Sequence, residues 1–191
     1  DTGRIVIDDA EVELGSVRDA QRLGVDTVYQ DLALAPDLSV TDNMFLGHEL
    51  TRGGFLRALD RKQMRERADA ALRELSINLP SLNVPVRELS GGQRQAVAVA
   101  RAVMWSTTAV LMDEPTAALG ARQSDIVCDL MRTVAERGLG VLVVSHDLPR
   151  ILAVADRVVI LWRGETALDA PAAGLTVPDV VATMVGYKEA S

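Results

Sequence analysis

The sequence predicts an α/β fold built on a parallel sheet, and three observations support this prediction. Two short apolar runs, residues 109–112 and 140–144, have the length and composition of buried strands. Each is followed directly by polar, chemically useful side chains. An amphipathic helical segment, residues 122–137, separates the two runs. Strands that alternate with helices are typical of parallel sheets, whose ligands bind at the carboxyl ends of the strands.

Composition narrows the class of protein. The chain has 191 residues, 48% of them hydrophobic, which is enough for one domain with its own core. Its net charge of −7, from 27 acidic and 20 basic residues, argues against a surface for nucleic-acid phosphates. The sequence has no apolar run near the roughly 20 residues that span a bilayer and nothing that resembles a secretory signal. The chain has one cysteine, Cys128, which cannot form an internal disulfide, and this favours a reduced, cytosolic setting. Because Cys128 lies among apolar residues at helical spacing, we expect its thiol to be inert.

Residues 89–93, Leu-Ser-Gly-Gly-Gln, open a segment with strong helix propensity. Ser90 is a good N-cap, and the two glycines after it leave backbone N–H groups uncovered. Such a helix start can bind an anion, because the N–H groups and the positive end of the helix dipole point to one place. A simple loop-to-helix junction would have the same sequence, so this segment alone decides nothing.

Acidic and imidazole side chains follow the two predicted strands. Asp113 and Glu114 come directly after residues 109–112, and His146 follows residues 140–144. Of two carboxylates at a strand end, the first can hold Mg²⁺ and the second can position a water molecule. The sequence therefore predicts hydrolytic chemistry at the carboxyl edge of the sheet.

Four segments in this order resemble the motifs of ABC ATPases. Residues 28–31 resemble the Q-loop, residues 89–93 the signature motif and residues 110–114 the Walker B strand, while residues 145–147 resemble the switch histidine. The resemblance implies an α/β fold with a RecA-like P-loop NTPase core and a helical subdomain. Four motifs in the family's order are far more specific than any one of them.

The same resemblance divides the chain. Residues 1–30 and 106–191 would form the RecA-like core, and residues 31–105 the helical subdomain with the signature motif. The family's glycine-rich phosphate loop ends in Gly-Lys-Ser/Thr, but the only lysines here, Lys62 and Lys188, have no glycine frame. We therefore expect an N-terminal part of the core, roughly 50 residues, to be missing, and the fragment alone to be inactive. A naturally degenerate relative is the alternative.

The resemblance also assigns roles at the strand ends. Asp113 would bind Mg²⁺ through water, and Glu114 would polarise the water that attacks ATP. Gln30 would belong to the nucleotide site, where it would touch Mg²⁺ or that water and report the nucleotide state to the partner. His146 would contact the γ-phosphate and hold the geometry of Glu114. Without the other motifs, Gln30 would be read as an ordinary loop residue and His146 as a strand-end cap.

The signature segment would act across a dimer. Its residues would meet the γ-phosphate of ATP that is bound to a second ATPase subunit; they are Ser90, Gly91, Gly92 and Gln93. ATP would then hold the dimer closed, and hydrolysis would let it open.

Three classes of function remain for such a domain: the energy-coupling subunit of a membrane transporter, a soluble ABC-type ATPase that acts on nucleic acid or ribosomes, and a catalytically inactive interaction module. Chromosome and repair members insert long coiled coils, and translation members carry tandem domains and basic linkers. This chain is short and acidic, and it has no coiled-coil insertion between its motifs. These features favour transport.

Two further segments resemble ATPases of bacterial carbohydrate importers; they are residues 30–40 and 43–47. Gly120, where the family commonly has aspartate, also fits that subfamily. The resemblance implies a cytoplasmic subunit, peripheral on the inner face of the membrane. The stretch from Gln30 to Phe45 would contact transmembrane permease subunits. A periplasmic sugar-binding protein would be an indirect partner, and nucleic acid would not be one.

Overall fold

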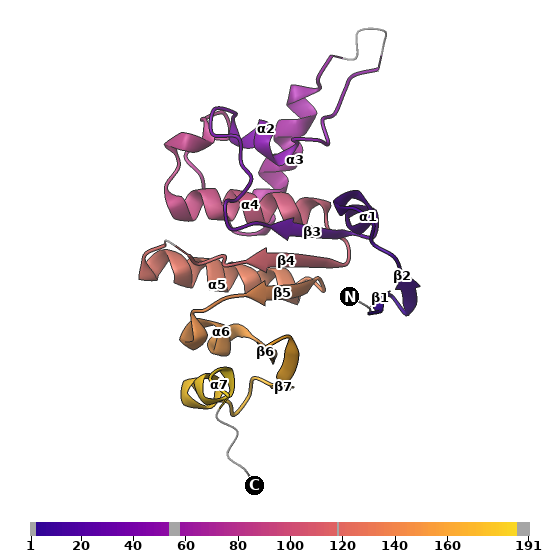
Figure 1. The fold of residues 1–191 in the computed structure, drawn as a ribbon. Helices are drawn as coiled ribbons and strands as arrows, with labels where there is room; N and C mark the ends of the chain where they lie inside the picture. The colour runs from indigo at the N-terminus through magenta and orange to yellow at the C-terminus, as the bar shows by residue number, and fades with distance from the viewer. Residues whose placement is uncertain (1–2, 54–57, 118, 187–191) are drawn as a thin grey trace.

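The computed structural model describes residues 3–53, 58–117 and 119–186. Its centre is a parallel sheet of three strands in the order β3-β4-β5 (Figure 1). The strands are β3 (Val25–Val28), β4 (Ala109–Asp113) and β5 (Gly140–Val144). The two predicted strands are confirmed, as is the α/β class.

Two long helices pack along this sheet. The helix α4 (Gly91–Trp105) contacts β3 and α5, and α5 (Ala121–Glu136) contacts β5. The small side chains of α4 allow close packing, so that most of the segment from Gln95 to Val103 is buried. Val110 and Met112 of β4 are fully buried between these helices and the neighbouring strands.

A second group of helices lies beyond α4 (Figure 1). It consists of α2 (Val40–Met44), α3 (Arg61–Glu74) and the 3₁₀ helix η1 (Val86–Glu88). The Asp60 carboxylate caps α3 by accepting the N–H of Gln63 at 3.1 Å. Apolar residues of α3 at helical spacing, Met64, Ala68 and Leu72, are buried as the periodicity predicts. Because α4 contacts α2 and α3 as well as β3 and α5, it joins the two parts of the fold.

The chain begins with a hairpin that the sequence only half predicts. The strands β1 (Ile5–Ile7) and β2 (Ala10–Val12) pair in an antiparallel manner, followed by α1 (Val17–Arg22). The alternating pattern of residues 3–8 predicts the first strand, whereas the sequence gives no prediction for the second. The turn between them is made by Asp8 and Asp9 with φ of +50° and +62°, and no glycine marks it.

The last third of the described chain continues from β5 through α6 (Leu148–Val154). An antiparallel pair, β6 (Arg157–Trp162) and β7 (Glu165–Pro171), then leads to α7 (Val177–Met184). Among the described residues, no helix is long and apolar enough to cross a membrane.

One face of β5 departs from the sequence expectation of a buried strand. Leu142 and Val144 are 61% and 60% exposed, whereas Val141 and Val143 are half-buried. The half-buried residues pack against the hydrophobic core on one side of the sheet. In the part of the chain that the structure describes, the other side of β5 stays open, and β5 and β6 are not paired.

The loop after β3 is closed by one buried amide. Asn43, with no exposed surface, accepts the N–H of Ala35 through Oδ1 at 2.7 Å. Its Nδ2 donates to the carbonyls of Ala35, Leu38 and Ser39 at 3.0–3.2 Å. These bonds fix the segment between β3 and α2, which carries the predicted partner contact.

We expect Asn43→Ala to lower the free energy of unfolding by about 2–4 kcal/mol, because it leaves buried backbone groups without partners. Urea unfolding followed by circular dichroism measures the change. The matched control is Asn78→Ala, which removes the same amide from an exposed position. A loss no larger than that of the control would show that the loop does not depend on Asn43.

Candidate active site

The parallel register brings the ends of three strands to one edge of the sheet. Asp113, the last residue of β4, lies opposite Val144, the last residue of β5. Gln30 and His146 each follow the end of a strand by two residues. The helices α4 and α5 begin at this same edge (Figure 1). The predicted residues of the strand ends therefore share one edge of the fold.

Glu114 follows β4 with an unusual backbone. Its φ of +49° is in the left-handed region, which costs a residue other than glycine about 1–3 kcal/mol. The conformation is held by its N–H, which donates to the carbonyl of Val144 at 2.9 Å, and by its carbonyl, which accepts the N–H of Ala117 at 3.0 Å. Strained residues that the surrounding structure enforces cluster at functional sites.

Glu114 and His146 face each other across this edge. Nδ1 of His146 lies 2.8 Å from Oε2 of Glu114. The carboxylate side chain is 19% exposed and the imidazole 79%. The distance is that of a hydrogen bond, and Oε2 is buried with no other partner among the described residues. This oxygen therefore keeps the capacity to accept a further hydrogen bond.

This contact changes the acidity of the imidazole. Side-chain hydrogen bonding to Glu114, and then the charge of Glu114, raise the pKa of His146 above its ordinary value of 6.5. The charge of Asp147 adds to the effect. A protonated imidazole at this place would suit an anionic ligand.

Asp113 and Gln30 are both exposed at the strand ends. They offer a carboxylate and an amide oxygen, the hard donors that Mg²⁺ prefers. In the described ranges no group of three or more His, Cys, Asp or Glu side chains forms a ready metal cage. One carboxylate and one amide oxygen fit an ion that keeps several water ligands, as Mg²⁺ does.

The segment 89–93 begins α4 as its sequence predicts. Ser90 is the N-cap, with Oγ accepting the N–H of Gln93 at 3.3 Å, and Oε1 of Gln93 accepts the N–H of Ser90 at 2.9 Å. The two glycines lie against the loop and helix after β4. A Cβ on Gly91 would come within 3.3 Å of Leu119, and one on Gly92 within 3.1 Å of Gln123.

Glu114 and His146 are thus brought into contact, whereas the segment 89–93 is not joined to them by any hydrogen bond or ion pair between described residues. Gly120, the position without the expected aspartate, caps α5, and its N–H donates to Oε1 of Gln123 at 2.9 Å. The start of α4 and the start of α5 therefore form one packed unit beside the strand ends.

One supporting residue escaped the sequence reasoning. Arg101 of α4 donates to the carbonyls of Leu32 and Ala33 at 3.0 and 2.7 Å. Those two residues follow Gln30 closely and both have positive φ, +63° and +44°. Burial lowers the pKa of Arg101, and the charge of Asp26 opposes that effect. A charged residue within the alanine- and valine-rich run 96–103 was the signal that could have revealed it.

Comparison with known proteins finds relatives that span nearly all of this chain. A family model described as "ABC transporter" matches residues 1–117. The fructose import ATP-binding protein FrcA of Rhizobium meliloti is 43% identical over 194 residues, which cover 99% of this chain and 75% of that protein. The xylose/arabinose import ATP-binding protein XylG of Sulfolobus acidocaldarius is 42% identical, over 98% of this chain and 73% of its own length.

Solved structures give the same answer for the fold. A dimeric ATP-binding cassette in a post-hydrolysis state with ADP and Pi has a TM-score of 0.70 at 27% identity and covers 91% of this chain and 75% of its own. The cbiO1 protein of Clostridium perfringens, part of the transporter complex cbiONQ, has a TM-score of 0.73 at 24% identity. It covers 90% of this chain and 66% of its own.

We expect Glu114→Gln to lower the pKa of His146, because an amide carries no negative charge. Nuclear magnetic resonance of the imidazole C–H signals as a function of pH measures this. Only two histidines, His48 and His146, are present, so His48→Gln assigns both signals. An unchanged titration of His146 would show that the two side chains do not interact in solution.

The same contact makes stability depend on pH. Because the folded-state pKa of His146 is raised above 6.5, the contact stabilises the fold below pH 6.5 while Glu114 is ionised. This stabilisation is lost as the pH rises through the raised pKa. The difference in unfolding free energy between the wild type and Glu114→Gln should therefore shrink over that range.

Proposed function

Since the chain belongs to the ABC transporter family of ATP-binding proteins, we propose that it is the ATP-hydrolysing, energy-coupling subunit of an importer for a sugar. The names of the fructose and xylose/arabinose relatives support the sugar. The observation that carries the hydrolytic role is the contact of Glu114 with His146 at 2.8 Å, beside Asp113 at the end of β4.

Glu114 is the residue we assign to the attacking water. Its buried Oε2 has no hydrogen-bond partner besides the His146 contact among the described residues, and the side chain is 19% exposed, so that a ligand water can reach the carboxylate. A general base must lie within hydrogen-bond reach of the proton that it accepts, and a water on the exposed part of this carboxylate would meet that condition. His146 keeps this carboxylate in place through Nδ1, so the other ring nitrogen, Nε2, is the one we assign to the γ-phosphate.

Asp113 and Gln30 are the residues we assign to Mg²⁺, on the strength of their oxygen donors at the same edge. When bound, the ion neutralises charge on the phosphates. Asp113 stays in place through its register opposite Val144, and Gln30 through the loop that Arg101 and Asn43 hold.

The signature segment is the part we assign to a second subunit. Ser90, Gly91, Gly92 and Gln93 begin a helix of 15 residues, whose N-terminal N–H groups attract phosphate. The side chains of Ser90 and Gln93 bond to each other's backbone, which keeps this helix start ordered before ligand arrives. In a dimer, ATP bound beside Glu114 of one subunit would be completed by this segment of the other.

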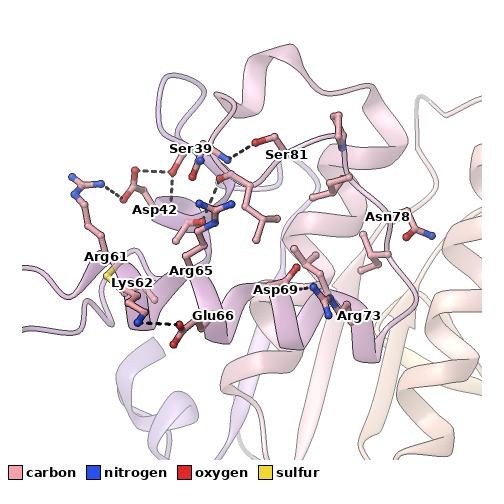
Figure 2. A pocket seen from close by; sticks show the side chains of 18 residues that line it. Ser39, Asp42, Arg61, Lys62, Arg65, Glu66, Asp69, Arg73, Asn78 and Ser81 are labelled. Atoms are coloured by element: carbon pink, nitrogen blue, oxygen red, sulfur yellow. Dashed lines mark hydrogen bonds and ion pairs between the residues drawn. The ribbon is translucent and has the colours of Figure 1, made fainter.

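A groove beside α3 is the surface we assign to the membrane permease subunit. It has a volume of about 830 Å³ and is lined by α3, the segment 77–83 and residues at the start of α2. Figure 2 shows charged side chains along its walls, six of them in three ion pairs: Arg61 with Asp42, Lys62 with Glu66, and Arg73 with Asp69. Half-buried apolar residues also line it; they are Ile77, Leu79 and Leu82.

Arg65 gives this groove a preference for one kind of partner. Among the described residues it has no carboxylate within ion-pair distance, and Figure 2 shows it reaching from α3 toward the opposite wall. A short amphipathic helix would place its apolar face on the floor of such a groove and an acidic side chain against Arg65. A cytoplasmic helix of a permease subunit has the position in the complex to do this.

Two residues of the predicted partner region do not reach the surface. We expect the stretch from Gln30 to Phe45 to face the partner, but Met44 and Phe45 within it have no exposed surface. They belong to the core, where Phe45 packs edge-on to Trp105. The groove instead includes Ser39, Thr41 and Asp42 at the start of α2.

For the hydrolytic role, we expect Glu114→Gln to abolish ATP hydrolysis, by about 100-fold or more, while ATP binding is kept and an ATP-bound dimer accumulates. Phosphate release and size-exclusion chromatography with ATP measure the two effects. The protein assayed must carry a glycine-rich phosphate loop joined to this chain, which itself contains no Gly-Lys-Ser/Thr sequence. Retained hydrolysis would remove Glu114 from the role of base.

For the groove, single cysteines at Leu38 and Ser81 should crosslink to a co-expressed permease subunit. Leu38 is 38% exposed beside the groove and Ser81 lines it. The native Cys128 is buried and gives little background. The control is Leu161→Cys on β6, 71% exposed and outside the groove. Equal crosslinking of the control, or none at the two groove positions, would contradict the assignment.

A further inference from the structure

The helix α6 is held to the fold in an unusual way. None of its seven residues is buried. Two arginines connect it to α5: Arg132 of α5 donates to the carbonyl of Ala153, and Arg150 of α6 donates through Nε to Asp125 of α5 at 3.0 Å. These polar contacts hold α6 to α5 beside the partly buried Ile151 and Val154, which pack against the core.

Arg150 also bonds to the residue next to His146. Its Nη1 donates to Oδ2 of Asp147 at 2.5 Å, while its Nε bonds to Asp125. The Arg150 and Asp147 side chains are only 31% and 23% exposed. A guanidinium can hold two carboxylates at once because its donors form a rigid planar fork.

The Asp147 carboxylate bonds to Arg150 and makes no capping hydrogen bond to the start of α6. Asp147 is the N-cap of α6, a position where aspartate ordinarily accepts a backbone N–H of the first helical turn. Here its side chain makes no such bond, and its carboxylate pairs with Arg150 instead. Its backbone N–H is meanwhile fixed by Oγ of Ser145 at 3.1 Å.

His146 lies between these fixed points. Its carbonyl accepts the N–H of Leu148 at 3.0 Å, and Asp147 directly after it is tied to α5 through Arg150. On its other side, β5 is held in the sheet. The imidazole is 79% exposed, so little packing of its own restrains it against Glu114.

We propose that Arg150 is a positioning residue, which by clamping Asp147 to Asp125 holds His146 against Glu114. The effect of this clamp on catalysis rests on the proposed function, whereas the contacts of Arg150 with Asp147 and Asp125 do not depend on it. The clamp makes the start of α5, which packs against the signature segment, part of the support of His146.

The pKa of His146 tests the clamp, because a positioning role and a purely electrostatic role of Arg150 would shift this pKa in opposite directions. The charged groups around this imidazole are Glu114, Asp147 and, through Asp147, Arg150. If Arg150 acted only by its charge, Arg150→Gln would raise the pKa of His146, because a nearby positive charge is lost. If Arg150 positions the imidazole against Glu114, the same substitution loosens that contact, and the pKa falls.

We therefore expect Arg150→Gln to lower the pKa of His146 in the 191-residue chain. Arg150→Lys is the second variant, because it keeps the charge and disturbs the fold less, yet its point charge cannot hold both aspartates. It should also lower the pKa. The matched control is Arg157→Gln, which breaks an exposed arginine–aspartate pair of 2.7 Å between β6 and β7. That control should leave the titration of His146 unchanged.

Two results would overturn the proposal. One is a pKa of His146 in Arg150→Gln at or above the wild-type value, and the other is an unchanged pKa of His146 in Arg150→Lys. The measurement needs no nucleotide, so it fails or succeeds apart from the hydrolytic role of Glu114. In the ATP-hydrolysing protein, Arg150→Lys should lower kcat about tenfold or more, because misplacement of a catalytic group slows the chemical step. The KM for ATP should stay unchanged, and a change in KM alone would also overturn the clamp.

Discussion

The parallel pairing of β4 with both of its neighbours is the constraint on which the candidate site depends. Because β3, β4 and β5 run in one direction, the residues after each strand must emerge at the same edge. Only this register turns Gln30, Asp113 and His146, which are far apart in the sequence, into neighbours at one edge. The hydrogen bond from the Glu114 N–H to Val144 then continues the pairing one residue beyond β4, and so fixes the turn that strains Glu114.

The parts of the fold that the sequence predicts well are those determined by local chemistry. The helix α3 has an aspartate cap and an apolar face at helical spacing, and α4 has a capping box before an alanine-rich run. Both begin where their caps indicate, because a cap satisfies backbone N–H groups within the same few residues. The order of the motifs likewise identifies the candidate residues at the strand ends.

The parts that the sequence does not reveal depend on contacts between distant segments. The apolar run around Arg101 marks this arginine as unusual, but it does not indicate that its donors reach Leu32 and Ala33 some seventy residues earlier. Exposure of Leu142 depends on what covers β5, not on the apolar run itself. Met44 and Phe45 read as part of a partner surface, but their burial follows from packing on α4, including Trp105. The distance between Glu114 and His146 is similarly a product of the assembled sheet.

The polar attachment of α6 has a dynamic consequence. The apolar side chains of α6 that pack on the core, Ile151 and Val154, are only partly buried, so detachment of this helix should cost less than global unfolding. The bonds that hold it are partly exposed ion pairs, which dissolved salt weakens over the Debye length of about 8 Å at physiological ionic strength. The chain from β5 to α6 therefore combines a strand that is held in the sheet with a loosely anchored helix. The amide hydrogens of α6 should exchange with solvent by local opening, while those of β4 exchange only when the whole domain unfolds.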